Sequence, residues 1–173
     1  SGRRVIIDER REGWTTYRRP NEPCLEYADT KADDEALLYF TSGTTGNPKM
    51  TVHGCAYPLG HETTGRFWLR AGAGDLVWNV SDTGWAKGAW SSLFAPWLCG
   101  AGIFALHADA VDPMRVLDGL EKYPVTILCA PPTAYRMLVK QTLGERRFAK
   151  LRHCVSAGEP LNPEVIEVWR GET

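Results

Sequence analysis

Short apolar runs alternate with longer segments of helical periodicity along most of this chain. The pattern predicts strands at 5–8, 36–40, 50–53, 76–80, 103–106, 125–129 and 151–155, and helices at 57–70, 86–98, 113–123, 133–141 and 163–169. Alternation of this kind predicts an α/β fold, a mostly parallel sheet with helices on both faces. In such a fold the ligand-binding loops lie at the carboxyl ends of the strands.

The segment YFTSGTTGNPK, residues 39–49, is rich in glycine and hydroxyl groups and follows an apolar run. Gly43 and Gly46 let the backbone approach a ligand closely and turn its amides inward. Hydroxyl donors come from Thr41, Ser42, Thr44 and Thr45. Lys49 adds a positive charge at the end of the segment, so the whole stretch predicts a cradle for a polyphosphate.

The Walker A loop is the obvious alternative for a glycine-rich segment that ends in lysine. Its pattern, G-x-x-x-x-G-K-[ST], requires a second glycine at the position of Pro48 when counted from Gly43. It also requires Ser or Thr after the lysine, where this chain has Met50. The spacing therefore argues against a P-loop NTPase.

The order T-S-G-T-T-G-x-P-K instead resembles the phosphate loop of the adenylate-forming superfamily. That superfamily includes acyl-CoA synthetases, luciferases and the adenylation domains of peptide synthetases. The resemblance implies a clasp on the β- and γ-phosphates of ATP, with Lys49 as the catalytic cation. The nucleotide-binding residues it implies are Thr41, Ser42, Gly43, Thr44, Thr45, Gly46, Asn47, Pro48 and Lys49.

A second motif, SDTGWAKGAW at 81–90, leaves one expected strand and enters an expected helix. It resembles the aromatic-substrate motif of medium-chain and branched-chain acyl-CoA synthetases. The resemblance implies that Trp85 lies at the acyl pocket and pantetheine tunnel, and that Lys87 and Trp90 limit the acyl channel. Trp68 completes the expected substrate-binding set, and the three tryptophans together favour a medium-length or branched apolar acid over acetate. The alternative is that Trp85 and Trp90 are core tryptophans at a strand–helix junction.

A third motif, VSAGEPLNPEV at 155–165, ends an apolar run in a small-residue turn. Asn162 and Pro163 have the chemistry of a helix start, with Asn at the N-cap and Pro at the first helical position. The family resemblance implies that the turn passes beside the adenine ring. The adenine-side candidates are Gly158, Glu159 and Pro160. The segment CAPPTAYRML at 129–138 also resembles the family's strand-to-helix segment beside the acyl pocket.

The resemblance extends from about Ala36 to the end of the chain. We expect residues 1–31 to be a lead-in from a preceding subdomain, irregular over 9–35, and residues 32–173 to be a partial AMP-binding α/β subdomain. It would belong to the large N-terminal domain of an adenylate-forming enzyme, without the C-terminal lid. Members of the superfamily are several times longer, so the resemblance implies an internal fragment that is inactive alone. The glutamate that binds magnesium would lie outside this chain.

The composition limits which binding partners and which cellular location we expect. With 20 basic and 21 acidic residues, the formal net charge is −1, which gives no basis for binding nucleic acid or an acidic membrane. No apolar stretch reaches the roughly 18 residues of a membrane span. The histidines show no metal-binding spacing, so no metal site is expected. The cysteines are Cys24, Cys55, Cys99, Cys129 and Cys154. They form no C-x-x-C pair and predict reduced thiols and a cytoplasmic location.

Together, these motifs predict part of an ATP-dependent acyl-CoA synthetase. Its substrates would be a small carboxylic acid, ATP and coenzyme A, with Mg²⁺ as cofactor; the sequence leaves the oligomeric state open. Two alternatives remain. An adenylation domain or fatty-acid AMP ligase would deliver the acyl group to a carrier protein, and a non-catalytic nucleotide-binding fragment would do no chemistry.

Overall fold

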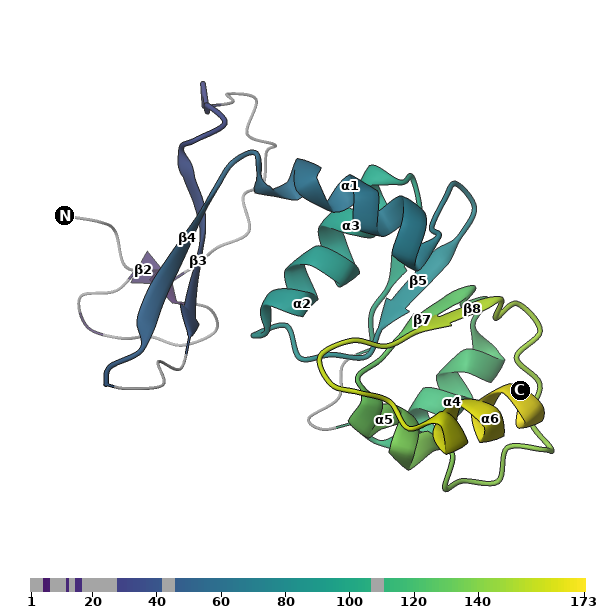
Figure 1. The fold of residues 1–173 in the computed structure, drawn as a ribbon. Coiled ribbons are helices and arrows are strands. Elements are labelled where there is room, and N and C mark those ends of the chain that lie inside the picture. The colour runs from purple at the N-terminus through teal and green to yellow at the C-terminus, as the bar shows by residue number, and fades with distance from the viewer. Residues whose placement is uncertain (1–4, 7–11, 13–14, 17–27, 42–45, 107–110) are drawn as a thin grey trace. The chain divides into compact units, whose positions relative to one another are not determined.

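The computed structural model describes residues 5–6, 12, 15–16, 28–41, 46–106 and 111–173. The chain divides into two compact units, Ser1–Thr30 and Lys31–Thr173 (Figure 1). In the first unit, β1 (Val5–Ile6) pairs in parallel with β2 (Thr15–Thr16). The strand expected at 5–8 is therefore found at its first two residues, and its other half lies outside the described residues. The stretch expected to be irregular includes β2.

The second unit contains a four-stranded parallel sheet with the order β6-β5-β7-β8. Its strands are β5 (Leu76–Asn79), β6 (Gly102–Phe104), β7 (Ile127–Cys129) and β8 (His153–Val155). Trp78 of β5 pairs with Phe104 on one side and Leu128 on the other. The predicted parallel sheet is confirmed, and the strands occur where the apolar runs placed them.

The phosphate-loop candidate belongs to a separate hairpin. Strands β3 (Glu35–Thr41) and β4 (Lys49–Gly54) form a two-stranded antiparallel sheet, which Thr41 and Lys49 close as its last pair. Each of the three motifs follows an expected strand, so the sequence predicts that all three meet at one edge of one mostly parallel sheet. That expectation is wrong for residues 41–49, because β3 pairs with β4 and not with a strand of the parallel sheet.

Each of the two helices expected before β5 and before β6 is a composite of short helical segments. The first consists of η1 (Tyr57–Gly60), α1 (His61–Thr63) and η2 (Thr64–Leu69), and the second of α2 (Ala86–Ala89), η3 (Trp90–Phe94) and α3 (Ala95–Leu98). Both η2 and η3 are π-helical. In the second composite the wide turn comes just before Pro96, which has no N–H to donate to the preceding turn.

The two composites approach each other closely at Gly65. A Cβ at this position would lie 2.6 Å from the Ala95 carbonyl oxygen and 2.6 Å from Cys99 Sγ. Any larger residue would push α3 away from η2. Glycine is therefore required here by the packing of the two helical segments.

Three further helices, α4 (Pro113–Lys122), α5 (Pro132–Leu138) and α6 (Pro163–Glu172), each begin with proline. Asp112 caps α4 by accepting hydrogen bonds from the amides of Met114 and Arg115. Asn162 occupies the predicted N-cap position of α6, although its side chain makes no capping hydrogen bond. These helices lie on one side of the parallel sheet, and α1, α2 and α3 lie on the other (Figure 1).

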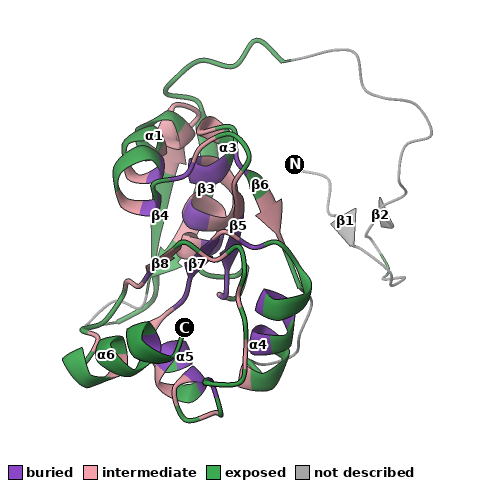
Figure 2. Ribbon diagram, turned by 90° about the vertical axis from the view of Figure 1, so that its right-hand side faces the viewer, coloured by how far each residue is buried: buried purple, intermediate pink, exposed green. Residues whose placement is uncertain are grey.

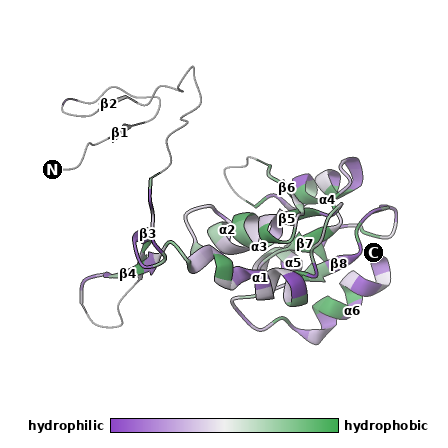
Figure 3. Ribbon diagram, turned by 90° about the horizontal axis from the view of Figure 1, so that it is seen from above, coloured by the Kyte–Doolittle hydropathy of each residue, from purple (hydrophilic) through white to green (hydrophobic). Residues whose placement is uncertain are grey.

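Each face of the sheet has its own hydrophobic core (Figures 2 and 3). Val77 and Ile127 point to the face covered by η2 and α3, whereas Trp78 and Leu128 point to the face covered by α4, α5 and α6. The first core includes Leu69, Ala95, Cys129 and Val155, and the second includes Leu117, Leu120, Tyr135, Leu138 and Trp169. Burial on both faces explains why these strands read as short continuous apolar runs.

At the amino edge of the sheet, Asp75 is the centre of a hydrogen-bond network. Its carboxylate accepts from Thr126 Oγ1 at 2.8 Å, from Arg152 Nε at 2.9 Å and from the Gly72 amide at 2.9 Å. The Arg152 guanidinium also donates to the Arg70 carbonyl at 2.7 Å. The Arg152 hydrogen bond is the main reason that the pKa of Asp75 is lowered, and Thr126 and the Gly72 amide add to it against the effect of burial.

We expect Asp75→Asn to reduce the free energy of unfolding at pH 7 by about 1–2 kcal/mol, because charge-assisted hydrogen bonds are lost at a largely buried site whose partner Arg152 is partly solvent-screened. A carboxyl with a lowered pKa stabilises the fold above its unfolded-state pKa and loses that effect as the pH falls. The difference from wild type should therefore shrink below about pH 4. Urea unfolding across pH checks this. Asp118→Asn is the control and should cost less than about 0.5 kcal/mol, because the Asp118 carboxylate is exposed and its partner Arg146 keeps an ion pair with Glu121.

Candidate functional site

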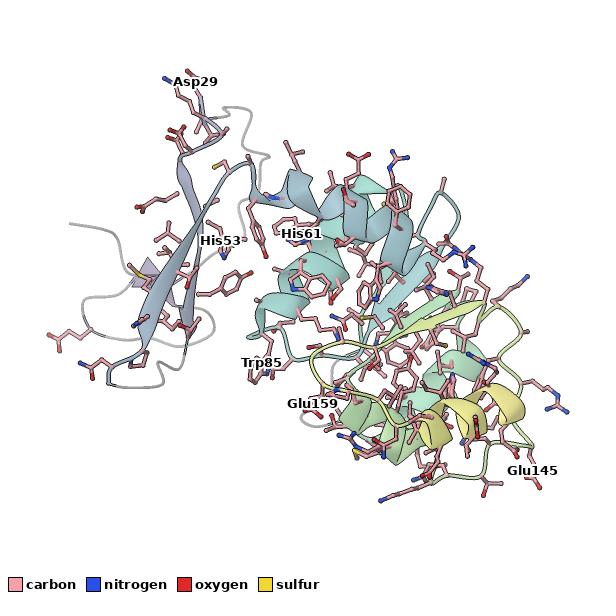
Figure 4. The ribbon with its side chains drawn as sticks, viewed as in Figure 1. Asp29, His53, His61, Trp85, Glu145 and Glu159 are labelled. Atoms are coloured by element: carbon pink, nitrogen blue, oxygen red, sulfur yellow. The ribbon has the colours of Figure 1, made fainter. Side chains whose placement is uncertain are left out.

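Two of the three predicted motifs meet at the carboxyl edge of the parallel sheet. Lys87, in α2 after β5, extends its ammonium group to the carbonyl oxygen of Ala157, in the turn after β8, at 3.4 Å. Trp85 and Glu159 lie at the same edge (Figure 4). The tertiary structure thus brings the implied acyl side and the implied adenine side into direct contact through one side chain.

The turn into α2 leaves Trp85 exposed. The Asp82 side chain accepts a hydrogen bond from the Gly84 amide at 2.6 Å, and the Asp82 carbonyl accepts from the Trp85 amide at 3.2 Å. Trp85 then stands at the N-cap position with 71% of its surface exposed. Burial in a core was the alternative explanation for this residue, and the exposure rules it out within the described unit.

Asn79 anchors the start of α2 to the end of β5. It is a buried polar residue, and its side-chain amide donates to the Lys87 carbonyl at 3.2 Å and to the Ser92 hydroxyl at 2.8 Å. Ser91 contributes a further contact, at 3.3 Å from the amide nitrogen. Sequence reasoning missed Asn79, although a polar residue that ends a buried apolar strand was a signal that could have found it.

Trp68 and Trp90 come together from the two composite helices. Their ring centroids are 5.7 Å apart, and the Trp90 indole also stacks on the His61 imidazole at 5.8 Å with an interplanar angle of 13°. Burial lowers the pKa of His61, and the nearby His53 lowers it further. A neutral imidazole therefore lies against the Trp90 ring at neutral pH. His61 was not among the expected site residues.

Further ring contacts connect this cluster to the hairpin. His53 of β4 lies 5.5 Å from Tyr39 of β3 and 4.3 Å from Tyr57, and Tyr57 lies 4.6 Å from His61 (Figure 4). Edge-to-face and tilted contacts of this kind add about 0.5–1.5 kcal/mol per pair. The strand that leads to Thr41 is therefore linked to the Trp90 cluster by a series of aromatic ring contacts, in which His53 packs between Tyr39 and Tyr57.

At the phosphate-loop candidate, the structure describes both ends of the loop. Thr41 Oγ1 donates to the Lys49 carbonyl oxygen at 3.3 Å, and both residues are exposed. Gly46 has a φ of 100°, a left-handed conformation that favours glycine. Asn47 and Pro48 are exposed as well. Ser42, Gly43, Thr44 and Thr45 lie outside the described residues.

The adenine-side candidates form an exposed turn. Gly158 has a φ of 105°, and the carboxylate of Glu159 forms an ion pair with Arg136 of α5 at 3.0 Å. Pro160 is exposed, whereas the hydroxyl oxygen of Ser156 is buried without a hydrogen-bond partner in the described part of the chain. Arg136 was not predicted, although it lies in the segment 129–138 that the sequence had singled out.

A cleft of about 250 Å³ lies beside this edge, at the carboxyl ends of β5 and β6. The helix after β5 covers one face of the sheet and the helix after β6 covers the other, so the two connections diverge there. Its lining includes Asn79, Thr83, Ser92, Phe104, Leu106 and Arg115. A cleft is therefore present on this side of β5 too, at the carboxyl ends of the strands.

Among the described residues, no group of three or more His, Cys, Asp or Glu side chains could hold a metal ion. Within the same ranges, no helix has the length and apolar character needed to cross a membrane.

The sequence matches the AMP-binding enzyme family over residues 3–173. It is 47% identical to acyl-coenzyme A synthetase ACSM3, mitochondrial, of Mus musculus, over 98% of this chain and 30% of that protein. It is 45% identical to human acyl-coenzyme A synthetase ACSM4, mitochondrial, over 93% of this chain and 28% of that protein. The chain thus spans less than a third of the length of these relatives.

Two solved structures share the fold. The anthranilate CoA ligase AuaEII, in complex with anthranoyl-AMP, superposes with a TM-score of 0.83 at 29% identity, over 98% of this chain and 34% of that chain. ATP-bound MatB from Rhodopseudomonas palustris superposes with a TM-score of 0.71 at 23% identity, over 84% of this chain and 28% of that chain. The likeness to MatB supports the fold alone.

The expected cytoplasmic location is contradicted by this comparison, because the ACSM3 relatives of mouse, rat, orangutan and human are all mitochondrial proteins. The expectation rested on cysteines without disulfide spacing. Unpaired thiols are compatible with any reducing compartment, so they could not distinguish one from another.

We expect Asn79→Ala to lower the free energy of unfolding by about 1–3 kcal/mol, because it removes the buried amide that donates to the Lys87 carbonyl and contacts two serine hydroxyls, and leaves that carbonyl only the hydrogen bond from Ser91. Hydrogen exchange should also speed up in α2 more than in α5. Ser92→Ala, which removes one of these acceptors, is the matched control and should cost less. Equal exchange in α2 for wild type and Asn79→Ala would contradict the anchoring role.

Proposed function

Because the chain belongs to the AMP-binding enzyme family, we propose that it is part of an ATP-dependent acyl-CoA synthetase. The observation that carries the proposal is the 47% identity with an acyl-coenzyme A synthetase over 98% of this chain. In the proposed reaction a carboxylate attacks the α-phosphate of ATP, an acyl-adenylate forms and pyrophosphate leaves. The acyl group then passes to coenzyme A and AMP is released. The activity is that of the longer protein.

The nucleotide side of the proposed site combines the hairpin and the turn after β8. Lys49 and Thr41 are paired at the mouth of the loop, so the Lys49 ammonium is available to a polyphosphate, and the Thr41 hydroxyl can donate to it once it leaves the Lys49 carbonyl. Negative charge grows on the departing pyrophosphate as the carboxylate attacks, and a fixed cation at that place lowers the barrier. The turn that holds Gly158, Glu159 and Pro160 is proposed to lie beside the adenine ring.

The acyl side of the proposed site is aromatic. Trp68 and Trp90 contact each other, and Trp85 is exposed at the carboxyl edge, where a substrate can reach it. Large flat apolar surfaces favour a medium-length or branched acid over acetate. Lys87 passes between this side and the adenine-side turn, so its ammonium group limits the length of an alkyl chain that enters from the edge.

The proposal assigns the Mg²⁺ ligand, a glutamate, to a part of the protein outside this chain. The described residues provide no cluster that fits a metal ion, so we derive no step through it. Coenzyme A and the carboxylic acid are proposed as substrates together with ATP.

The full-length protein, assayed with ATP, coenzyme A and a panel of carboxylic acids, tests this function. We expect ATP-dependent release of pyrophosphate and a CoA thioester that mass spectrometry identifies. A preference confined to amino acids would overturn the proposal. An acyl-adenylate without a thioester would assign the protein to the enzymes that deliver acyl groups to a carrier protein.

We expect Lys49→Ala in the full-length protein to slow adenylation and weaken ATP binding by about 2–4 kcal/mol, because a charge-assisted contact is lost in the transition state. Pyrophosphate release and ATP titration measure the two effects. Lys150→Ala, at an exposed lysine outside the proposed site, is the control and should behave as wild type. Normal adenylation with lost thioester formation would assign Lys49 to the other half-reaction.

We expect Lys87→Leu and Trp90→Ala to shift the preference of the full-length protein toward longer acids, because each removes a group that limits the acyl channel. Each methylene that is newly accommodated contributes about 0.8 kcal/mol in the ideal case. The measurement is kcat/KM along a series from acetate to decanoate. Trp97→Ala, at an exposed tryptophan of α3, is the control. Parallel profiles for wild type and both variants would exclude Lys87 and Trp90 from the pocket.

A further inference from the structure

The turn after β8 is held by two cations that come from opposite faces of the sheet. Lys87 belongs to the α2–α3 segment, which packs on the face with Val77 and Ile127. Arg136 belongs to α5, which packs on the face with Trp78 and Leu128. Both side chains reach past the carboxyl edge to the same short turn.

The two contacts fall on either side of Gly158. Lys87 Nζ donates to the Ala157 carbonyl at 3.4 Å, and Arg136 Nη2 donates to Glu159 Oε2 at 3.0 Å. Gly158 itself has a left-handed backbone, and a Cβ built on it would find no atom within 4 Å. A side chain at this position would therefore meet open space. The side-chain hydrogen bonds that reach the turn from other elements come from Lys87 and Arg136, one on each side of Gly158.

Each cation is itself fixed by the fold. The Lys87 backbone carbonyl accepts from Asn79 at the end of β5. Arg136 follows Tyr135, a buried residue whose hydroxyl shares its one proton between the Leu128 and Val155 carbonyls, at 3.3 and 3.4 Å. Through these contacts the two cations connect the turn to three strands, β5, β7 and β8.

We propose that Lys87 and Arg136 form a two-cation clamp on residues 156–160 and that Arg136 is a positioning residue for nucleotide binding. The second part rests on the proposed function, in which this turn lies beside the adenine. Arg136 and Glu159 are partly exposed, so their ion pair adds little to global stability. Its effect is local, on the conformation of the turn, and because the pair is solvent-accessible it is weakened by salt.

The test uses the full-length protein with Arg136→Gln, Glu159→Gln and the double variant. Arg66→Gln is the matched control, because it removes another exposed arginine–glutamate pair, with Glu62 in the α1–η2 segment. The first readout is hydrogen exchange at the amides of residues 157–159, which does not depend on catalysis. The second is KM for ATP and kcat at low and high salt.

We expect Arg136→Gln to speed exchange in the turn and to raise KM for ATP about two- to five-fold, with kcat changed less than about two-fold, as befits an exposed ion pair. The KM difference should shrink in 1 M salt. In the hydrogen-exchange measurement, the double variant should match either single variant, because each single substitution already removes the whole Arg136–Glu159 interaction. Arg66→Gln should leave exchange at 157–159 unchanged.

Unchanged exchange in Arg136→Gln, or additive effects in the double variant, would overturn the clamp. Faster exchange with an unchanged KM for ATP would overturn the positioning role. If the wild-type protein adenylated no carboxylate, the proposed function would fail, and the exchange measurements would still decide the clamp.

Discussion

The arrangement of the parallel sheet depends on the hydrogen bonds that the carboxylate of Asp75 accepts. It connects the start of β5 to Thr126 before β7 and to Arg152 before β8, and Arg152 continues to the Arg70 carbonyl at the end of η2. Three strands and one helical segment are thereby aligned at the amino edge. Since parallel strands share a direction, alignment at one edge sets where their loops emerge at the other.

The functional features gather at that opposite edge. Connections after β5 and β8 leave the sheet there, and Lys87 bridges them through the Ala157 carbonyl. The helices on each face bring one cation each to the turn after β8. A polar edge of this kind, above two hydrophobic cores, places charged groups where a ligand can reach them without burying any of them in the hydrophobic interior.

The hairpin of β3 and β4 is a separate antiparallel sheet and is stabilised differently from the parallel sheet. A two-stranded sheet is marginally stable alone, and the outward side chains of Leu38, Phe40, Met50 and Val52 remain exposed. Beyond the chain connection from β4 into η1, ring contacts that pass from Tyr39 through His53 and Tyr57 to His61 link it to the rest of the unit. Sequence periodicity identified both strands but treated β3 as part of the parallel sheet, because an apolar run of five residues does not reveal its pairing partner.

The sequence by itself determined the order of strands and helices, the starts of α4 and α6, and the family, because apolar periodicity, proline positions and the T-S-G-T-T-G-x-P-K motif are local properties of the chain. Only the tertiary structure decided which loops meet. The Lys87–Ala157 contact joins residues 70 positions apart, and the Arg136–Glu159 pair and the stacking of His61 on Trp90 likewise connect separate segments. Such contacts depend on the order of the strands and on which face of the sheet each helix covers. A short stretch of the sequence reveals neither of these features.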